Sequence, residues 1–213
     1  MKVCIIGNGL SALTLAKGIV NQNVFVDIFA QNKAKSINQT RTIGISKNNS
    51  DFFNKNIINI EKFLWKLKRI EIFTDNLKNK ELLNFENKND HLFSIIRNHD
   101  LYKVLEKDLS KNKYFKKYIV KKGNLSFINN YDFIINCDYT HKITKKYFNK
   151  KIVKEYNSLA YTSIITHKKI LNNIAIQIFT KFGPLAFLPI SNYETSVVYS
   201  IQYPFNNKKP NIE

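Results

Sequence analysis

Two glycines one residue apart interrupt the chain at residues 7 and 9, directly after an apolar run that begins at residue 3. Beyond them, apolar residues recur at the spacing of one helix face: Leu13, Leu15, Ala16, Ile19 and Val20. A second apolar run follows at residues 24–29. This order predicts a strand, a tight turn, a helix and a second strand, which is how a dinucleotide-binding βαβ unit begins.

The residues of the predicted turn are suited to holding a pyrophosphate. Gly7 would allow a sharp exit from the strand, and Gly9 would leave room for the anion to approach the backbone. Leu10 and Ser11 would open the helix, whose unpaired N–H groups attract an anion. Ala12 takes the place of the third glycine of the usual fingerprint, where helix and strand pack closely. An ordinary strand-to-helix turn is the alternative interpretation.

One residue of the usual fingerprint is missing. An Asp or Glu normally ends the second strand and binds the ribose hydroxyls. Here Ala30 occupies that position, and only Gln31 offers a polar group nearby. We therefore expect a lower nucleotide affinity than that of an intact site.

Length and composition predict a globular protein of one large or two interleaved domains. The chain has 213 residues, of which 44% are hydrophobic, with 16 Phe and 11 Tyr to fill a core. Its apolar runs are too short for a transmembrane helix, and no signal peptide is recognisable, which predicts a cytoplasmic protein. Cys4 and Cys137 lie in apolar runs, as buried, reduced thiols do. The four histidines lack metal-ligand spacing, so we predict no metal site.

The formal charge of +18 allows two interpretations. Lysine is spread through the chain beside abundant Asn and Ile, as AT-rich coding would produce. The densest lysine runs, residues 111–122 and 142–154, could instead lie against nucleic acid or an anionic membrane surface. No nucleic-acid-binding motif accompanies them, so nucleic acid is the weaker candidate.

The remaining pattern predicts mixed α/β structure followed by antiparallel β structure. Residues 39–46 form a short strand or loop, a helix starts near residue 50, and residues 69–74 and 81–86 form a hairpin. Residues 92–109 have helical spacing, with Asp100 in the first turn, and 131–138 read as a buried parallel strand ending in Asp138. Alternating strands follow at 160–167, 174–179, 185–190 and 196–202.

Five segments, in the same order, resemble the class A flavin-dependent aromatic hydroxylases, and most closely the ubiquinone-biosynthesis hydroxylases of the UbiH type. The glycine turn at residues 7–12 is similar to the FAD fingerprint of the family, and residues 41–46 are similar to its R-x-(I/L)-A-L-S segment. Residues 96–101 resemble the V-E-N-x-x-L helix start, and 137–141 lie where the family has A-D-G-x-x-S. Residues 179–189 match F-T-x-x-G-P-x-A-x-L-P, which is the most specific of the five motifs.

This resemblance implies an α/β fold in which a Rossmann-like FAD-binding domain, residues 1–65 and 92–152, is interleaved with an antiparallel β substrate domain, residues 66–91 and 153–213. It implies FAD as cofactor, NAD(P)H as reductant, and transfer of one oxygen from O2 to a polyprenylated phenol in ubiquinone biosynthesis. No catalytic side chain is expected. Further cofactor-binding residues would be Gln31, Arg41, Arg97, Asn98 and Asp138. The residues facing flavin and substrate would be Gly183, Pro184 and Leu185.

The sequence also departs from the family. Besides Ala30, Tyr139 replaces the glycine of the D-G motif, and the sequence ends before the second G-D motif and the C-terminal helical region of the family. We therefore expect either a truncated product or a diverged, non-catalytic remnant or partner subunit that keeps a nucleotide-binding fold. An NAD(P)-binding module with a basic surface is a third alternative, which the match at Gly183 and Pro184 opposes. Expected partners are a lipophilic phenol, and an anionic membrane surface at the inner membrane face or other ubiquinone-biosynthesis proteins.

Overall fold

The computed structural model describes residues 1–30, 38–75, 81–87, 90–120, 128–148, 150, 152, 154 and 156–203. The chain forms two compact units. The first consists of Met1–Asn38, Asp51–Glu61 and His99–Ile152, and the second of Gln39–Ser50, Lys62–Asn98 and Val153–Glu213. Residues 39–50, 62–65 and 92–98, which we assigned to the FAD-binding domain from the sequence, group with the second unit.

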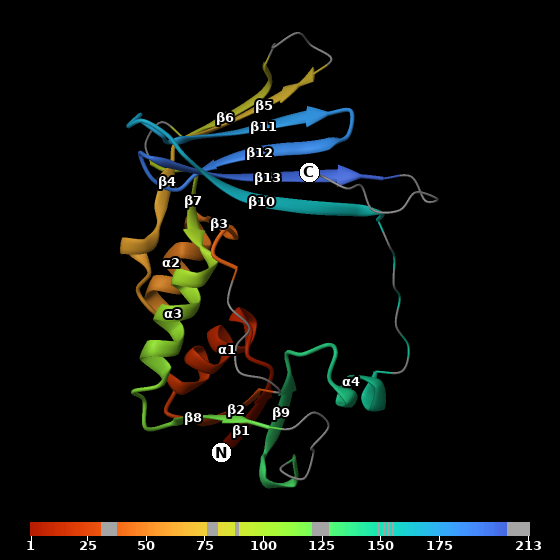
Figure 1. Ribbon diagram of the computed structural model, residues 1–213. Helices are drawn as coiled ribbons and strands as arrows, with labels where there is room; N and C mark the ends of the chain where they lie inside the picture. The colour runs from red at the N-terminus through yellow and green to blue at the C-terminus, as the bar shows by residue number, and fades with distance from the viewer. Residues whose placement is uncertain are drawn as a thin grey trace. The chain divides into compact units, whose positions relative to one another are not determined.

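A four-stranded parallel sheet forms the centre of the first unit (Figure 1). Its strands lie in the order β8 (Phe115–Ile119), β2 (Phe25–Ala30), β1 (Lys2–Ile6) and β9 (Phe133–Asn136). All three neighbouring pairs are parallel. The predicted strand, turn, helix and strand are present, because β1 pairs with β2 and α1 (Leu10–Val20) connects them.

Helices bury their apolar faces in the first unit. α1 buries Ala12, Leu13, Ala16 and Val20, and α3 (Asn98–Leu109) buries Leu101, Tyr102, Leu105 and Leu109. An ion pair of 2.7 Å joins Lys17 Nζ on α1 to Asp108 Oδ2 on α3. α4 (Lys142–Tyr147) is a short helix after β9. α2 (Lys47–Asn56) begins three residues before the predicted start, near residue 50.

A buried carboxylate anchors the N-terminal strand. Asp27 on β2 is only 3% exposed, pairs with Lys2 Nζ at 2.9 Å and accepts a hydrogen bond of 2.6 Å from the Tyr131 hydroxyl. The pairing raises the pKa of Lys2, and burial together with the Asp27 bond raises that of Tyr131. Because both partners satisfy the carboxylate, its burial is tolerated.

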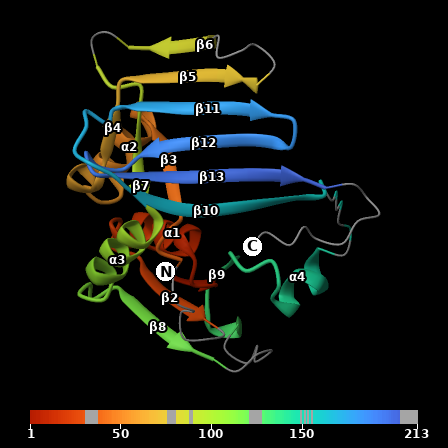
Figure 2. The same cartoon turned by 45° about the horizontal axis from the view of Figure 1, so that its top comes forward.

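The second unit consists of two sheets. A three-stranded antiparallel sheet has the order β3 (Thr42–Ser46), β7 (Phe93–Arg97) and β4 (Trp65–Leu67), and a 3₁₀ turn, η1 (Glu61–Phe63), precedes β4. Figure 2 shows the six-stranded sheet in the order β10 (Ser158–Thr166), β13 (Glu194–Gln202), β12 (Gly183–Pro189), β11 (Ile174–Thr180), β5 (Arg69–Thr74) and β6 (Glu81–Glu86). Leu67, Ile95 and Ala175 form the buried core of this unit.

The structure corrects three expectations from the sequence. Residues 93–97 form a strand rather than the start of a helix, because β7 is the central strand between β3 and β4 and buries Ile95 and Ile96. The helix itself starts at Asn98, with Asp100 in its first turn as predicted. β9 is parallel but lies at a sheet edge, so its Phe133 is 59% exposed instead of buried. The lysine run at residues 111–122 contains an unpredicted edge strand, β8.

The predicted hairpin of β5 and β6 and the four late strands are present. A second 3₁₀ turn, η3 (Ile128–Asn130), precedes β9. Among the described helices, none combines the length and apolar character needed to cross a membrane.

We predict that the buried Cys4 thiol makes the protein sensitive to alkaline pH. Cys4 is fully buried, and burial, followed by the charge of Asp27, raises its pKa from 9.0 to about 12. The folded state therefore holds this proton more tightly than the unfolded state does. The stabilisation is complete below pH 9 and is lost as pH rises through the folded pKa, at about 1.4 kcal/mol per pH unit.

Urea unfolding measured across the alkaline range tests this prediction against the Cys4→Ala variant. That variant is less stable at neutral pH because of its small cavity, but its stability should decline less steeply above pH 9. Lys2 and Tyr131 titrate in both proteins, so the difference in slope reports Cys4. Equal slopes would contradict the assignment.

Candidate functional site

The carboxyl edge of the parallel sheet brings together two of the predicted motifs. β1 lies between β2 and β9, so the strand order changes direction there, and ligands of such sheets bind at this kind of switch point. The glycine turn follows β1, and residues 137–138 follow β9. A Cβ added to Gly7 would lie 3.2 Å from the Cys137 carbonyl carbon and 3.4 Å from the Asp138 nitrogen. The two turns are therefore in direct backbone contact.

Gly7 is required by the backbone itself. Its φ of +121° is rarely adopted by residues with a side chain, and its N–H donates to the Phe29 carbonyl oxygen at 2.9 Å. The sharp exit from β1 that the sequence suggested is present.

Gly9 has a different role, because the position that a side chain would take there borders open space. It is the N-cap of α1 with extended dihedrals, φ −85° and ψ 177°, and a Cβ added there would meet no described atom within 4 Å. The first turn of α1 contains no acidic residue, and no side chain caps it. The N-terminal N–H groups of α1 therefore face open space that an anion could occupy. Leu10 is half-buried, Ser11 exposed and Ala12 fully buried against the sheet.

A hydrogen bond from α3 holds the glycine turn, and our sequence analysis did not predict it. The Tyr102 hydroxyl, on a side chain only 5% exposed, donates to Asn8 Oδ1 at 3.0 Å. Burial raises the pKa of Tyr102, which keeps this donor protonated. The same hydroxyl lies 3.5 Å from Glu106 Oε1, and Glu106 pairs with Lys117 on β8. An Asn between the two glycines was the available signal, because its side chain needs a partner when half-buried.

Asp138 is engaged in its own turn. Its Oδ1 accepts hydrogen bonds from the Thr140 N–H at 2.9 Å and the Thr140 hydroxyl at 2.7 Å, and its carbonyl accepts from the His141 N–H. The carboxylate therefore shapes the loop between β9 and α4. Ala30, at the position of the missing acid, is 1% exposed, and Gln31 lies outside the described residues.

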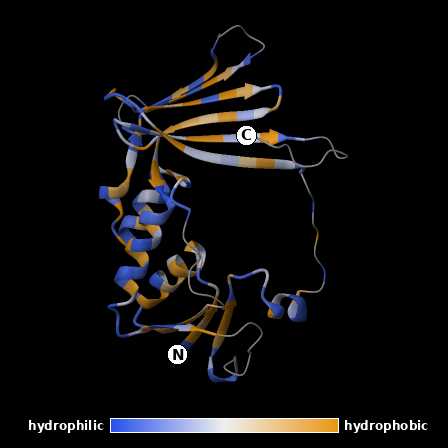
Figure 3. Ribbon diagram, in the orientation of Figure 1, coloured by the Kyte–Doolittle hydropathy of each residue, from blue (hydrophilic) through white to orange (hydrophobic). Residues whose placement is uncertain are grey.

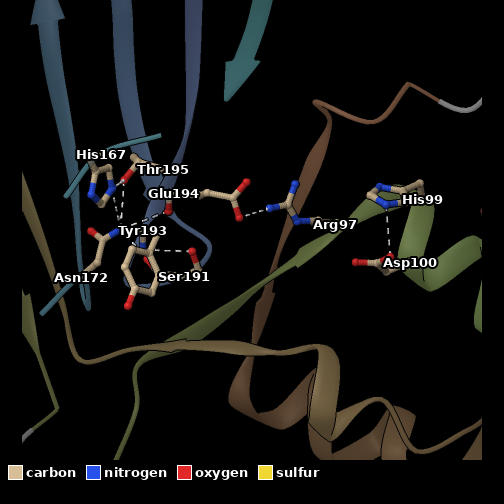
Figure 4. Close-up of polar contacts among 9 residues, drawn as sticks. All are labelled: Arg97, His99, Asp100, His167, Asn172, Ser191, Tyr193, Glu194 and Thr195. Atoms are coloured by element: carbon tan, nitrogen blue, oxygen red, sulfur yellow. Dashed lines mark hydrogen bonds and ion pairs between the residues drawn. The ribbon is translucent and has the colours of Figure 1, made fainter. Parts of the chain in front are cut away.

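Arg41, Arg97 and Asn98 belong to the second unit, where β3 and β7 bring them together. The Asn98 N–H donates to the Arg41 carbonyl oxygen at 2.9 Å, and the Arg41 side chain is exposed. The Arg97 guanidinium forms an ion pair of 2.7 Å with Glu194 Oε2 (Figure 4). Asn98 Oδ1 is buried and has no hydrogen-bond partner among the described residues. A buried oxygen of this kind is a candidate acceptor for a ligand N–H.

Gly183 is required for the packing of β12 against β13, because a side chain there would collide with the neighbouring strand. Its φ is +136°, and a Cβ added there would lie 2.0 Å from the Ser200 carbonyl oxygen on β13. The Thr180 hydroxyl donates to its carbonyl oxygen at 2.8 Å and closes the turn between β11 and β12. Pro184 and Leu185 follow in β12, half-buried and paired with Phe179 and Ile178.

The histidines have structural partners in the described residues. His167 Nε2 lies 3.0 Å from Thr195 Oγ1, and Asn172 Nδ2 donates to the Ser191 carbonyl oxygen at 2.8 Å (Figure 4). These bonds tie the connection before β11 to the turn before β13. In the first unit, His99 Nε2 lies 3.2 Å from Asp100 Oδ1.

Neither a metal site nor an activated thiol is found in the part of the chain that the structure describes. No group of three or more His, Cys, Asp and Glu side chains could hold a metal ion there. Cys4 and Cys137 are free thiols, and burial raises the pKa of both. The thiols are therefore poor nucleophiles at neutral pH.

Solved structures share this fold, whereas no family model and no curated protein match the sequence. The chain is similar to PqsL from Pseudomonas aeruginosa in complex with 2-aminobenzoylacetate, with a TM-score of 0.74 and 12% identity, over 95% of this chain and 61% of PqsL. An HpxO variant from Klebsiella pneumoniae complexed with FAD has a TM-score of 0.73 at 10% identity, over 98% and 59%. For p-nitrophenol 4-monooxygenase PnpA from Pseudomonas putida, the values are 0.73 and 10%, over 94% and 57%.

These similarities confirm the predicted fold class: the chain has the α/β fold of FAD-dependent aromatic monooxygenases. It spans about three fifths of the length of the proteins it matches. The glycine turn fits the pyrophosphate of such a cofactor, because Gly9 leaves open space at a helix N-terminus. The end of β2 does not offer the usual ribose acceptor, because Ala30 is apolar and buried.

We predict that alanine at one motif glycine, Gly183, destabilises the protein, whereas alanine at another, Gly9, has almost no effect on stability. Gly183→Ala forces a Cβ onto the β13 backbone, and holding an alanine at this positive φ should by itself cost about 1–3 kcal/mol. Gly9→Ala meets no atom and keeps allowed dihedrals, so the free energy of unfolding should change by less than about 0.5 kcal/mol. Urea unfolding of both variants measures this difference. A wild-type midpoint for Gly183→Ala would show that β12 and β13 do not pack this closely.

We also predict that Tyr102 stabilises the glycine turn. Tyr102→Phe removes the bond to Asn8 while keeping the buried ring, and should lower stability by about 0.5–1.5 kcal/mol. Tyr193→Phe, at a ring 51% exposed, is the matched control and should be neutral. If amide exchange of the residues 7–10 is as slow in Tyr102→Phe as in the wild type, the bond does not hold the turn.

Proposed function

We propose that this chain provides the FAD-binding and substrate-covering parts of a monooxygenase that hydroxylates an aromatic ring. The observation that carries the proposal is the open space at Gly9 beside the N-terminus of α1, in a fold that FAD-dependent monooxygenases share. When bound, FAD would supply the redox chemistry that passes one oxygen atom from O2 to the ring.

The roles that we assign to the chain are binding and positioning. Gly7, Gly9, Leu10, Ser11 and Ala12 would hold the pyrophosphate through backbone N–H groups and the end of α1. The unpartnered Oδ1 of Asn98 would accept a hydrogen bond from the cofactor, with Arg41 beside it.

Other assigned residues reach the cofactor less directly. Asp138 supports the glycine turn through the contact of its backbone with Gly7. Arg97 would act with its charge neutralised by Glu194. Gln31 keeps the role that the family resemblance gives it, at a position outside the described residues.

We further propose a polyprenylated phenol of ubiquinone biosynthesis as the substrate and NAD(P)H as the reductant. The support is the sequence resemblance at residues 41–46, 96–101 and 179–189. Gly183, Pro184 and Leu185 would belong to the sheet that covers the substrate. No side-chain nucleophile is needed for this chemistry.

A second candidate is a nucleotide-binding protein without oxygenase activity. Ala30 favours it, because a buried apolar side chain at the end of β2 cannot bind ribose hydroxyls. FAD binding without turnover would support this alternative, and turnover with a prenylated phenol would exclude it.

We predict that Gly9→Val weakens FAD binding without unfolding the protein. A Cβ added to Gly9 would meet no described atom within 4 Å, so a valine there would extend into the space that the pyrophosphate needs. Flavin fluorescence titration should show a loss of about tenfold or more, equal to about 1.4 kcal/mol. Thr14→Val, on the same helix but away from the turn, is the control and should bind FAD like the wild type.

The assignment is wrong if Gly9→Val retains wild-type FAD affinity at an unchanged melting temperature. The finer proposal needs a second measurement, in which NAD(P)H oxidation depends on a prenylated phenol and labelled O2 enters the product.

A further inference from the structure

The exposed surface of α4 and of its C-terminal end combines positive charge with apolar rings. Lys142, Lys145 and Lys146 lie three and four positions apart and are all exposed, so they share one face of the helix. Tyr147 and Phe148 end the helix with 62% and 68% of their surface exposed. We call these five residues, with Lys150, the α4 surface.

The parallel sheet holds α4 in a fixed orientation. His141 is 2% exposed and caps the helix by accepting a hydrogen bond from the Ile143 N–H at 3.3 Å. Ile143 packs in one cluster with Cys4, Ile6 and Phe29 of β1 and β2. Asn136 on β9 donates to the Thr144 hydroxyl at 2.7 Å. Ile143 therefore packs into the core, and the three lysines of α4 face solvent.

The charge of the α4 surface is not neutralised locally. Residues 139–150 contain four lysines and no Asp or Glu. None of these lysines forms an ion pair with any residue that the structure describes. The Lys146 ammonium instead lies 5.2 Å from the centre of the Tyr147 ring. Figure 3 shows hydrophilic and hydrophobic residues side by side along α4.

We infer that the α4 surface docks on a bilayer that contains anionic lipid. Lysines beside exposed aromatic rings match a membrane interface, where head groups take the charge and the acyl boundary takes the rings. Nucleic acid also attracts lysine, but the three arginines of the chain, Arg41, Arg69 and Arg97, all lie outside this surface, and arginine is the residue that most often contacts base edges. The inference does not depend on the proposed oxygenase activity.

Co-sedimentation of the purified chain with lipid vesicles tests the inference. The probes are vesicles of phosphatidylcholine mixed with phosphatidylglycerol and vesicles of phosphatidylcholine alone. The wild type should bind only the anionic vesicles, and binding should fall as salt rises, because screening shortens to about 8 Å at physiological ionic strength. The triple variant Lys142→Gln, Lys145→Gln, Lys146→Gln should bind at least about tenfold more weakly.

A matched control separates this surface from the net charge of the protein. Lys103→Gln, Lys168→Gln, Lys169→Gln removes the same charge from exposed lysines elsewhere and should keep most of the binding. The pair Tyr147→Ser, Phe148→Ser should lose the binding that remains at high salt. Circular dichroism melts confirm that each variant folds.

Three outcomes would overturn the inference. Equal binding to neutral and anionic vesicles would remove the role of charge. An equal loss in the control triple would assign the binding to diffuse charge, as coding bias predicts. Tighter binding of a single-stranded RNA homopolymer at the same salt, lost in the α4 triple variant, would identify a nucleic-acid surface instead.

Discussion

The close backbone contact at the ends of β1 and β9 is the constraint on which the first unit depends. β1 is an inner strand, buried on both faces, and it must leave the sheet without colliding with the chain that leaves β9. Gly7 allows this through its positive φ, with the Cys137 backbone at contact distance. Any side chain at Gly7 would separate the two turns and move the start of α1. The position of the N-terminus of α1 therefore follows from one backbone contact.

Around this contact, hydrogen bonds from side chains fix the conformation of the two turns. Tyr102 fixes Asn8, and Thr140 fixes Asp138, so the loops are shaped before a ligand arrives. Preformed geometry of this kind lowers the ordering cost of binding. In the second unit, the ion pair with Glu194 likewise fixes the position of the Arg97 side chain.

The glycines of the two motifs show why a motif match and a role are different findings. Gly9 borders open space, so its lack of a side chain leaves the N-terminus of α1 accessible. Gly183 lies against the backbone of β13, so its lack of a side chain serves strand packing. Both belong to segments that resemble the same family. The two glycines differ in what lies around the position of the missing Cβ: open space at Gly9, and the backbone of a neighbouring strand at Gly183.

The sequence by itself determined the local elements: β1, α1 and β2 from the periodicity around Gly7 and Gly9, and the late strands from alternation. Local pattern could not separate β7 from α3, because Ile95 and Ile96 are apolar in either conformation and only their neighbours β3 and β4 make them a strand. It also missed β8, whose lysines are tolerated at a sheet edge where the charged ends reach water. Tertiary structure alone decided that Gly7 touches Asp138, that Tyr102 bonds Asn8 and that Glu194 neutralises Arg97. These pairs are far apart along the chain, and contacts of that kind depend on how strands and helices pack, which no local spacing encodes.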